Sequence, residues 1–89
     1  MQKLTWLEIN NSLEKTYTFD SFLGAIAFMQ EASKSIDELN HHPEWMNIYN
    51  KVIVTLRTHD AGNTLTGLDY KLAEILDRLY ENRQSIAIK

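Results

Sequence analysis

The chain begins with a strand-like alternation of apolar and polar residues. Apolar residues at Trp6, Leu7 and Ile9 precede a polar break at residues 10–12. After the break, the polar residues Glu14, Thr16 and Thr18 alternate with Leu13, Lys15, Tyr17 and Phe19. A period of two is typical of a strand with one buried face, so residues 6–19 are predicted to form a hairpin.

The next segment has the spacing of an amphipathic helix. Either Asp20 or Ser21 is a suitable N-cap. Apolar residues then recur in one stripe, at Phe22, Ala25, Ile26, Met29, Ala32, Ile36 and Leu39. The helix is predicted to end near Asn40, because Pro43 disfavours helical geometry at His42.

The second half of the chain repeats this order. Residues 45–58 are rich in β-forming residues, and two strands that turn at Asn50 are predicted there. Thr66 is the predicted N-cap of a final helix, and the tail after Arg83 is expected to fray. The buried stripe of this helix is predicted to comprise Leu68, Leu72, Ile75, Leu76 and Leu79.

The order strand, strand, helix, strand, strand, helix predicts an α+β fold. We expect a two-layer sandwich, with a four-stranded antiparallel sheet and both helices packed on one face. The 89 residues are expected to form a single domain, residues 1–89. A domain of this size buries only about 60 % of its unfolded surface, so a homodimer or homotetramer is expected. The second sheet face would be free for a ligand or another subunit.

Charge and composition exclude several classes of function. The net charge is −3 and the basic residues are scattered, so nucleic acid is not an expected partner. No run of 18 apolar residues occurs and the first residues lack a secretory signal, so we expect no membrane association and a cytoplasmic location. There is no cysteine, which excludes disulfides and thiolate catalysis. Chemistry must therefore come from histidine, carboxylate, hydroxyl or tyrosine side chains.

The three histidines all fall at the ends of predicted elements, where clefts form. Successive side chains on an extended segment point in opposite directions, so His41 and His42 cannot both point inward unless the loop bends. A histidine beyond a helix C-terminus is stabilised as imidazolium by the helix dipole and suits a general acid. Zinc bound by His41, His42 and His59 is not expected, because adjacent ligands diverge and no i, i+4 histidine pair exists.

The spacing of these residues resembles that of a known family. An acidic residue stands four positions before a His-His-Pro, followed by an aromatic residue, a distant histidine and an aspartate. Here these positions are Asp37, His41-His42-Pro43, Tyr49, His59 and Asp69. The pattern, with the string from residue 38 to 52, is similar to the pterin-4a-carbinolamine dehydratases, and the resemblance runs from about Trp6 to the last helix.

The resemblance implies a lyase that removes water from 4a-hydroxytetrahydropterin and gives quinonoid dihydropterin, in tetrahydropterin recycling. It implies no metal and no organic cofactor. Carried over to this chain, His41 and His59 would act as acid and base, and His42 would mainly hold the substrate. The pterin site would be lined by Asn40, Arg57, Thr58 and Asp60.

Some neighbouring residues have two interpretations. Trp45 is either a wall on which the flat pterin stacks or a core residue of a short strand. Asp69 stands three residues after Thr66, which is the spacing of a capping box, so a role in starting the helix is favoured over catalysis. Asn40 replaces an aspartate that is common in the family, and Arg57 stands where some relatives have a small hydroxyl residue.

A non-catalytic dimerisation or interaction module of the same fold is the alternative. Animal relatives also serve as dimerisation partners of a transcription factor. The presence of all three histidines favours the enzyme.

Overall fold

The computed structural model describes residues 6–88, with side chains as far as Arg83. The expectation that the chain carries no secretory signal concerns residues 1–5, which lie outside the described residues. The elements follow one another as β1 (Leu7–Ile9), β2 (Ser12–Thr18), α1 (Phe22–Leu39), β3 (Glu44–Ile48), β4 (Lys51–Leu56), the 3-10 turn η1 (His59–Ala61) and α2 (Gly67–Ile88).

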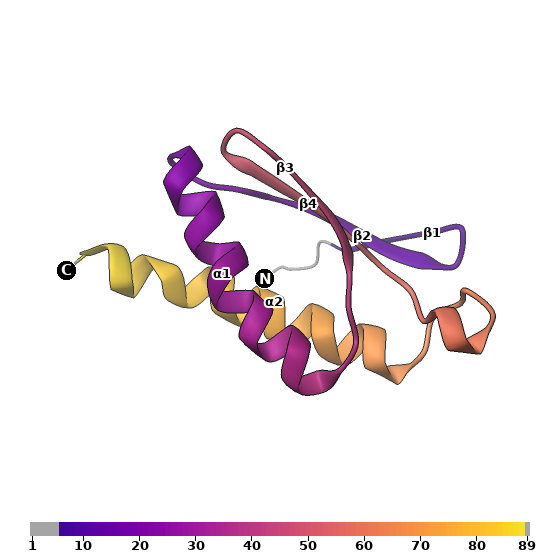
Figure 1. The fold of residues 1–89 in the computed structure, drawn as a ribbon. Coiled ribbons are helices and arrows are strands. Elements are labelled where there is room, and N and C mark those ends of the chain that lie inside the picture. Colours follow the sequence, from indigo (N-terminus) through magenta and orange to yellow (C-terminus); the bar gives the residue numbers. More distant parts are fainter. Residues whose placement is uncertain (1–5, 89) are drawn as a thin grey trace.

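The four strands form one antiparallel sheet in the order β1-β2-β4-β3. Both helices lie on the same side of this sheet, and α2 crosses behind α1 in the view of Figure 1. The predicted α+β sandwich is therefore confirmed. Among residues 6–88, no helix combines the length and the apolar character that a bilayer crossing requires.

The alternation along the strands sets which side chains enter the core. Tyr17 of β2 lies opposite Val52 of β4, and Trp45 of β3 lies opposite Val54. Tyr17, Val52, Val54 and Leu56 are buried, whereas Met46 and Ile48 alternate to the other face and are exposed. This is the expected result of a period-two pattern in a sheet with helices on one face.

Helix α1 begins and ends as the sequence predicts, but one end of its buried stripe is different. The hydroxyl of Ser21 accepts a hydrogen bond from the Gly24 N–H at 3.0 Å, which caps the first turn. The prediction that Phe22 is buried is wrong, since it is 45 % exposed. Phe28, absent from the predicted stripe, is buried instead and packs against Tyr17 with ring centroids 5.0 Å apart.

Helix α2 starts directly after Thr66 and is assigned as far as Ile88, and the expected fraying of the tail after Arg83 stays a prediction. Leu72 and Leu76 are buried as predicted, whereas Leu68 in the first turn is 40 % exposed. The helix is attached to the sheet through Asp77, whose carboxylate accepts hydrogen bonds from the Tyr17 hydroxyl and the Lys15 ammonium, each at 2.6 Å.

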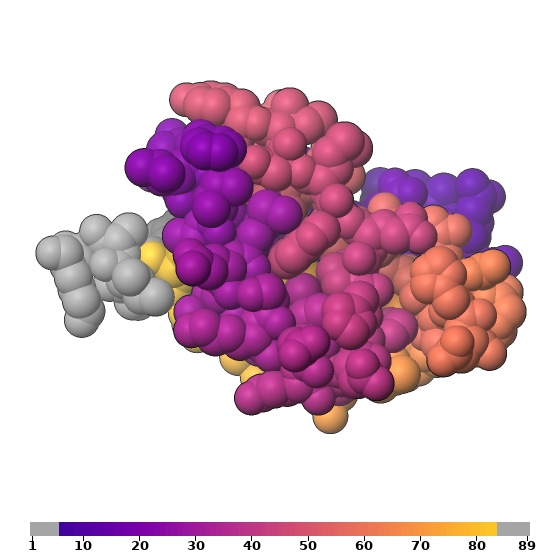
Figure 2. All heavy atoms as spheres, in the orientation of Figure 1, coloured from indigo at the N-terminus to yellow at the C-terminus, as the bar shows by residue number. Residues whose placement is uncertain are grey.

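The tip of the β3–β4 hairpin packs beside the start of α1. The Phe19 N–H donates to the Asn50 carbonyl at 2.8 Å, and the Asn50 side-chain amide donates back to the Phe19 carbonyl at 2.8 Å. Figure 2 shows the two segments in contact at one end of the molecule. The histidines lie at the opposite end of these strands, where β3 begins and β4 ends.

Candidate functional site

Two connections meet at one end of the sheet and bring the three histidines into the same region. Strands β3 and β4 are antiparallel, and Glu44 at the start of β3 pairs with Thr55 near the end of β4. Residues 40–43, which lead into β3, and residues 57–60, which follow β4, therefore lie at the same end. Figure 2 shows the segment after β4, in orange, beside the chain that leads out of α1.

His41 points into the protein and pairs with a buried carboxylate. Its Nε2 atom lies 2.6 Å from Oδ1 of Asp69. The other carboxylate oxygen, Oδ2, accepts hydrogen bonds from the Thr58 hydroxyl at 2.8 Å and from the Thr66 N–H at 3.0 Å. The Thr58 and Thr66 hydroxyls lie 2.7 Å apart. Asp69 thus has the capping contact that its spacing predicts, and also a contact with His41 on a distant segment.

This network orients the His41 ring. A fully buried carboxylate is stable only when its oxygens are satisfied, and here His41, Thr58 and Thr66 satisfy them. When Nε2 donates its hydrogen to Asp69, the neutral ring carries its lone pair on Nδ1. A carboxylate behind an imidazole also fixes the orientation of the ring. The Asp69 carboxylate therefore fixes the orientation of the His41 ring.

His42 points the other way, as the alternation of an extended segment predicts. Its Nε2 atom lies 3.5 Å from Oδ1 of Asp37, near the end of α1. Both side chains border a hollow of about 550 Å³ between α1 and the start of β3. The hollow is lined by Ser33, Lys34, Ile36, Asp37, Glu38, His42, Pro43 and Trp45.

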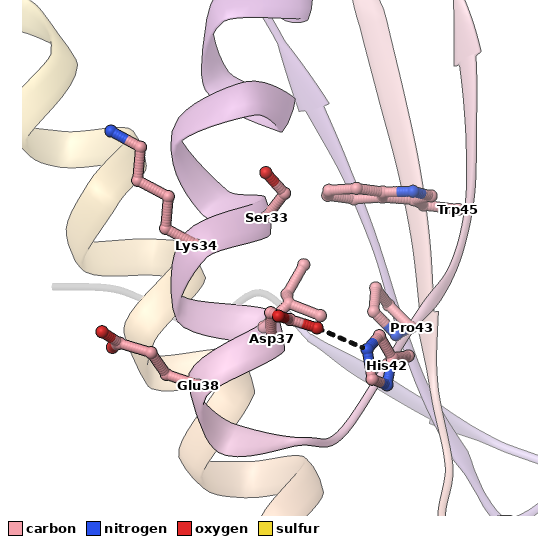
Figure 3. A pocket seen from close by; sticks show the side chains of 8 residues that line it. Ser33, Lys34, Asp37, Glu38, His42, Pro43 and Trp45 are labelled. Carbon is pink, nitrogen blue, oxygen red and sulfur yellow. Dashed lines mark ion pairs between the residues drawn. The ribbon is translucent and has the colours of Figure 1, made fainter.

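The hollow has one flat aromatic wall and a polar edge. In Figure 3, Ser33 and Asp37 on α1 face the Trp45 indole and the His42 imidazole, whereas Lys34 and Glu38 extend away from them. Trp45 is half-buried and packs against the core, as a core residue of a short strand would, and it also borders the hollow. A volume of this size suits a small planar molecule with a few hydrogen-bond donors.

His59 lies at the surface, held between two oxygen atoms. Its side chain is 62 % exposed, Nδ1 lies 2.7 Å from Oδ1 of Asn63, and Nε2 lies 3.6 Å from Oε2 of Glu44. The other oxygen of Glu44 accepts a hydrogen bond from Nη2 of Arg57 at 3.2 Å. His41 and His59 are not among the residues that line the hollow, so His42 is the histidine that reaches it directly.

The remaining predicted site residues have different surroundings. Asn40 is exposed and adopts a left-handed conformation (φ 55°) that ends α1, with its N–H donating to the Asp37 carbonyl at 3.1 Å. Thr58 is buried in the Asp69 network, and Asp60 is exposed within η1. Tyr49 lies at the far tip of the β3–β4 hairpin and is 68 % exposed, remote from the histidine end.

Sequence reasoning missed several contacts. Ser33 is absent from the predicted site residues. Ser33 and Asp37 are four residues apart, so they lie on one face of the helix and form a polar stripe that leads to His42. Glu44 and Asn63 have no signal in the sequence that links them to His59. No group of three His, Asp or Glu side chains within the described part of the chain is arranged to hold a metal ion.

Comparison of the chain with known proteins identifies one family. The family model described as pterin 4 alpha carbinolamine dehydratase matches residues 1–79. Proteins provisionally named as pterin-4-alpha-carbinolamine dehydratases include one from Rhizobium etli, 49 % identical over 82 % of this chain and 71 % of its own. Another, from Sinorhizobium medicae, is 51 % identical over 85 % of this chain and 71 % of its own.

Two solved structures have the same fold. A transcriptional coactivator/pterin dehydratase from Brucella melitensis superposes with a TM-score of 0.79 at 36 % identity, over 84 % of this chain and 81 % of that one. A pterin dehydratase-like RuBisCO assembly factor of the alpha-carboxysome gives 0.74 at 21 % identity, over 86 % of this chain and 90 % of its own, and indicates the fold alone. From its matching residues and its relatives, the chain belongs to the pterin 4 alpha carbinolamine dehydratase family.

Proposed function

We propose that this chain catalyses the dehydration of 4a-hydroxytetrahydropterin to quinonoid dihydropterin and water. The observation that carries the proposal is the buried His41–Asp69 pair, with Nε2 and Oδ1 2.6 Å apart, next to a histidine that faces a hollow of about 550 Å³. Membership of the dehydratase family supports the same reaction.

The reaction needs one proton acceptor and one proton donor. The C4a–O bond breaks as the hydroxyl takes up a proton and leaves as water, and the N5–H bond supplies the electron pair of the new C4a=N5 double bond. His41, backed by the Asp69 carboxylate, takes the N5 proton on Nδ1. His59 supplies the proton to the departing hydroxyl from Nδ1, and the hydroxyl takes the place of the Asn63 side chain that this atom faces in the free protein. A well-placed acid or base of this kind contributes about 10²- to 10⁴-fold in rate.

Part of the substrate is assigned to the hollow, and its C4a–N5 edge extends beyond the hollow toward the connections that carry His41 and His59, since neither histidine lines the hollow. The pterin ring stacks on the Trp45 indole, and its amino group and ring N–H donate to the Asp37 carboxylate. Paired donors on a planar ring match the two oxygens of a carboxylate. His42, 3.5 Å from Asp37, contacts the same edge of the ring and orients it. Two connections approach the ring at the end of the sheet where the histidines lie. They carry Asn40, Arg57, Thr58 and Asp60.

The experiment is a rapid-mixing assay that follows the absorbance of freshly formed 4a-hydroxytetrahydropterin. Wild-type protein is expected to accelerate its decay, and the double variant His41→Ala with His59→Ala is expected to lose the acceleration. Tyr70→Phe, an exposed substitution on α2, is the matched control and keeps full activity. A wild-type protein that leaves the decay rate unchanged, or a double variant as active as wild type, overturns the proposal.

A non-catalytic interaction module is the second candidate. It is favoured by the apolar side chains on the sheet face away from the helices, where Leu7 is 61 %, Met46 53 % and Ile48 52 % exposed. A homo-oligomer, dimer or tetramer, would cover part of this face. Pull-down with wild type and with His41→Ala separates the two candidates. Equal capture of a partner by both proteins, together with no effect on pterin decay, would favour the module.

A further inference from the structure

The His59 imidazole is restrained by side chains from two different elements. Asn63, in the loop after η1, brings Oδ1 to 2.7 Å from Nδ1, and Glu44, at the start of β3, brings Oε2 to 3.6 Å from Nε2. Asn63 itself adopts a left-handed backbone conformation (φ 58°), which asparagine tolerates well. A ring that is 62 % exposed would otherwise sample several rotamers.

Glu44 is in turn held by Arg57. Glu44 pairs with Thr55 across the strands, and Arg57 is two residues beyond Thr55, so both side chains project from the same face of the sheet. The two carboxylate oxygens have separate partners, because Oε1 accepts from Nη2 of Arg57 at 3.2 Å while Oε2 faces His59. The guanidinium thereby orients the carboxylate that faces the imidazole.

The guanidinium of Arg57 contacts Glu44, whereas one of its other nitrogen atoms has no partner in the described part of the chain. Its Nε atom is buried and has no hydrogen-bond partner within the described residues. Buried donors without a partner are unfavourable and uncommon in folded proteins. An arginine that served only the ion pair with Glu44 could extend toward solvent and leave no donor buried. In the structure, Nη2 of this guanidinium lies 3.2 Å from Oε1 of Glu44.

We propose that Glu44 and Arg57 are positioning residues that hold the His59 imidazole with Nε2 directed at the Glu44 carboxylate. Neither residue touches the reacting atoms, and both act through His59. This inference rests on the proposed function for its catalytic consequence. The placement of the ring itself does not depend on any activity.

The first test uses the protein without substrate. Two-bond ¹H–¹⁵N spectra of the histidine rings are recorded for wild type, Glu44→Gln and Arg57→Gln, with His59→Ala to assign the signals. Both substitutions are expected to shift the His59 Nε2 resonance and to leave those of His41 unchanged. A His59 ring unaffected by either substitution overturns the proposal. Because no turnover is measured, this result stands even when the protein proves to have no dehydratase activity.

The second test measures dehydration. Glu44→Gln is expected to lower kcat about 10- to 100-fold, the range typical of residues that orient a functional ligand, with KM nearly unchanged. Arg57→Lys keeps the charge and is expected to retain more activity than Arg57→Gln. Glu74→Gln, in an exposed i, i+4 pair on α2, is the matched control and keeps wild-type kcat.

A double-mutant cycle separates positioning from a general structural effect. In a His59→Ala background, Glu44→Gln is expected to cause no further loss of kcat, because its effect passes through the missing ring. An equal loss of kcat in the presence and absence of His59 overturns the proposal.

Discussion

Nε2 of His41 lies 2.6 Å from Oδ1 of Asp69, and both side chains are buried although 28 positions separate them along the chain. The pair connects the loop after α1 with the first turn of α2. The Asp69 carboxylate also accepts hydrogen bonds from Thr58 and Thr66. The same side chain therefore stabilises the fold and orients the His41 imidazole.

Replacement of Asp69 by asparagine should therefore affect both properties. The amide has the same shape but no charge, and its nitrogen must face either His41 or the Thr58 hydroxyl and Thr66 N–H. Loss of a buried ionic partner costs about 3 kcal/mol of unfolding free energy. The change in tautomer is expected to lower kcat on the order of 10²- to 10⁴-fold. Urea unfolding and the pterin assay measure the two effects.

Thr58→Val is the control for that experiment. It removes one hydrogen bond to Asp69 and leaves the His41 contact in place, so the expected loss of stability is only about 1 kcal/mol. An Asp69→Asn variant that loses no more stability and no more kcat than Thr58→Val would contradict the role assigned to the pair.

Asn40 should tolerate glycine better than alanine. Its φ of 55° ends α1 in the left-handed region, where a β-carbon is strained and asparagine or glycine is favoured. Asn40→Ala is expected to lower the unfolding free energy by about 1 kcal/mol, whereas Asn40→Gly should match wild type. Thermal unfolding of the two variants makes the comparison. Equal melting temperatures for both would show that the backbone conformation is not limiting.

Stability should fall in alkaline solution because of Tyr17. Burial, together with its hydrogen bond to Asp77, raises the pKa of the Tyr17 phenol well above its ordinary value. The folded protein therefore retains this proton more tightly than the unfolded chain. The resulting stability is complete below about pH 10, the ordinary pKa of tyrosine, and declines as the pH rises further.

Tyr17→Phe tests this linkage. The variant is expected to be less stable near neutral pH, because the hydrogen bond to Asp77 is lost, and to show a shallower decline of unfolding free energy above about pH 10. Urea titrations at a series of pH values measure both slopes. Identical slopes for wild type and variant would exclude Tyr17 as the source.

Trp45 should contribute to ligand affinity through its flat face. Trp45→Leu keeps an apolar side chain in the hollow but removes the stacking surface, which is worth about 0.5–1.5 kcal/mol. The dissociation constant for a stable reduced pterin is expected to rise about two- to tenfold, as measured by isothermal titration calorimetry. Trp6→Phe is the control, because Trp6 bonds to Asp77 and does not line the hollow. An unchanged affinity in Trp45→Leu would place the ligand elsewhere.

The sequence by itself determined the order of the elements, the two-layer architecture and most helix limits. These depend on local chemistry: the alternation that buries Val52, Val54 and Leu56, the Ser21 cap, and the position of Pro43. The spacing of His41, His42 and His59 also predicted a site at this end of the sheet, and of the three only His42 lines the hollow found there. Local periodicity did not predict the whole buried stripe of α1, since Phe22 is exposed and Phe28 is buried. Phe28 is buried because it packs against the aromatic side chains of Tyr17 and Phe19.

Only the tertiary structure decided how the three histidines differ. His41 turns toward Asp69 of α2, His42 faces Asp37 of α1, and His59 meets Glu44 of β3. Each partner is brought in by strand register or helix packing across the fold. A sequence pattern specifies which side chains are available, but the core sets the distance between two segments. Those distances give each imidazole a different partner.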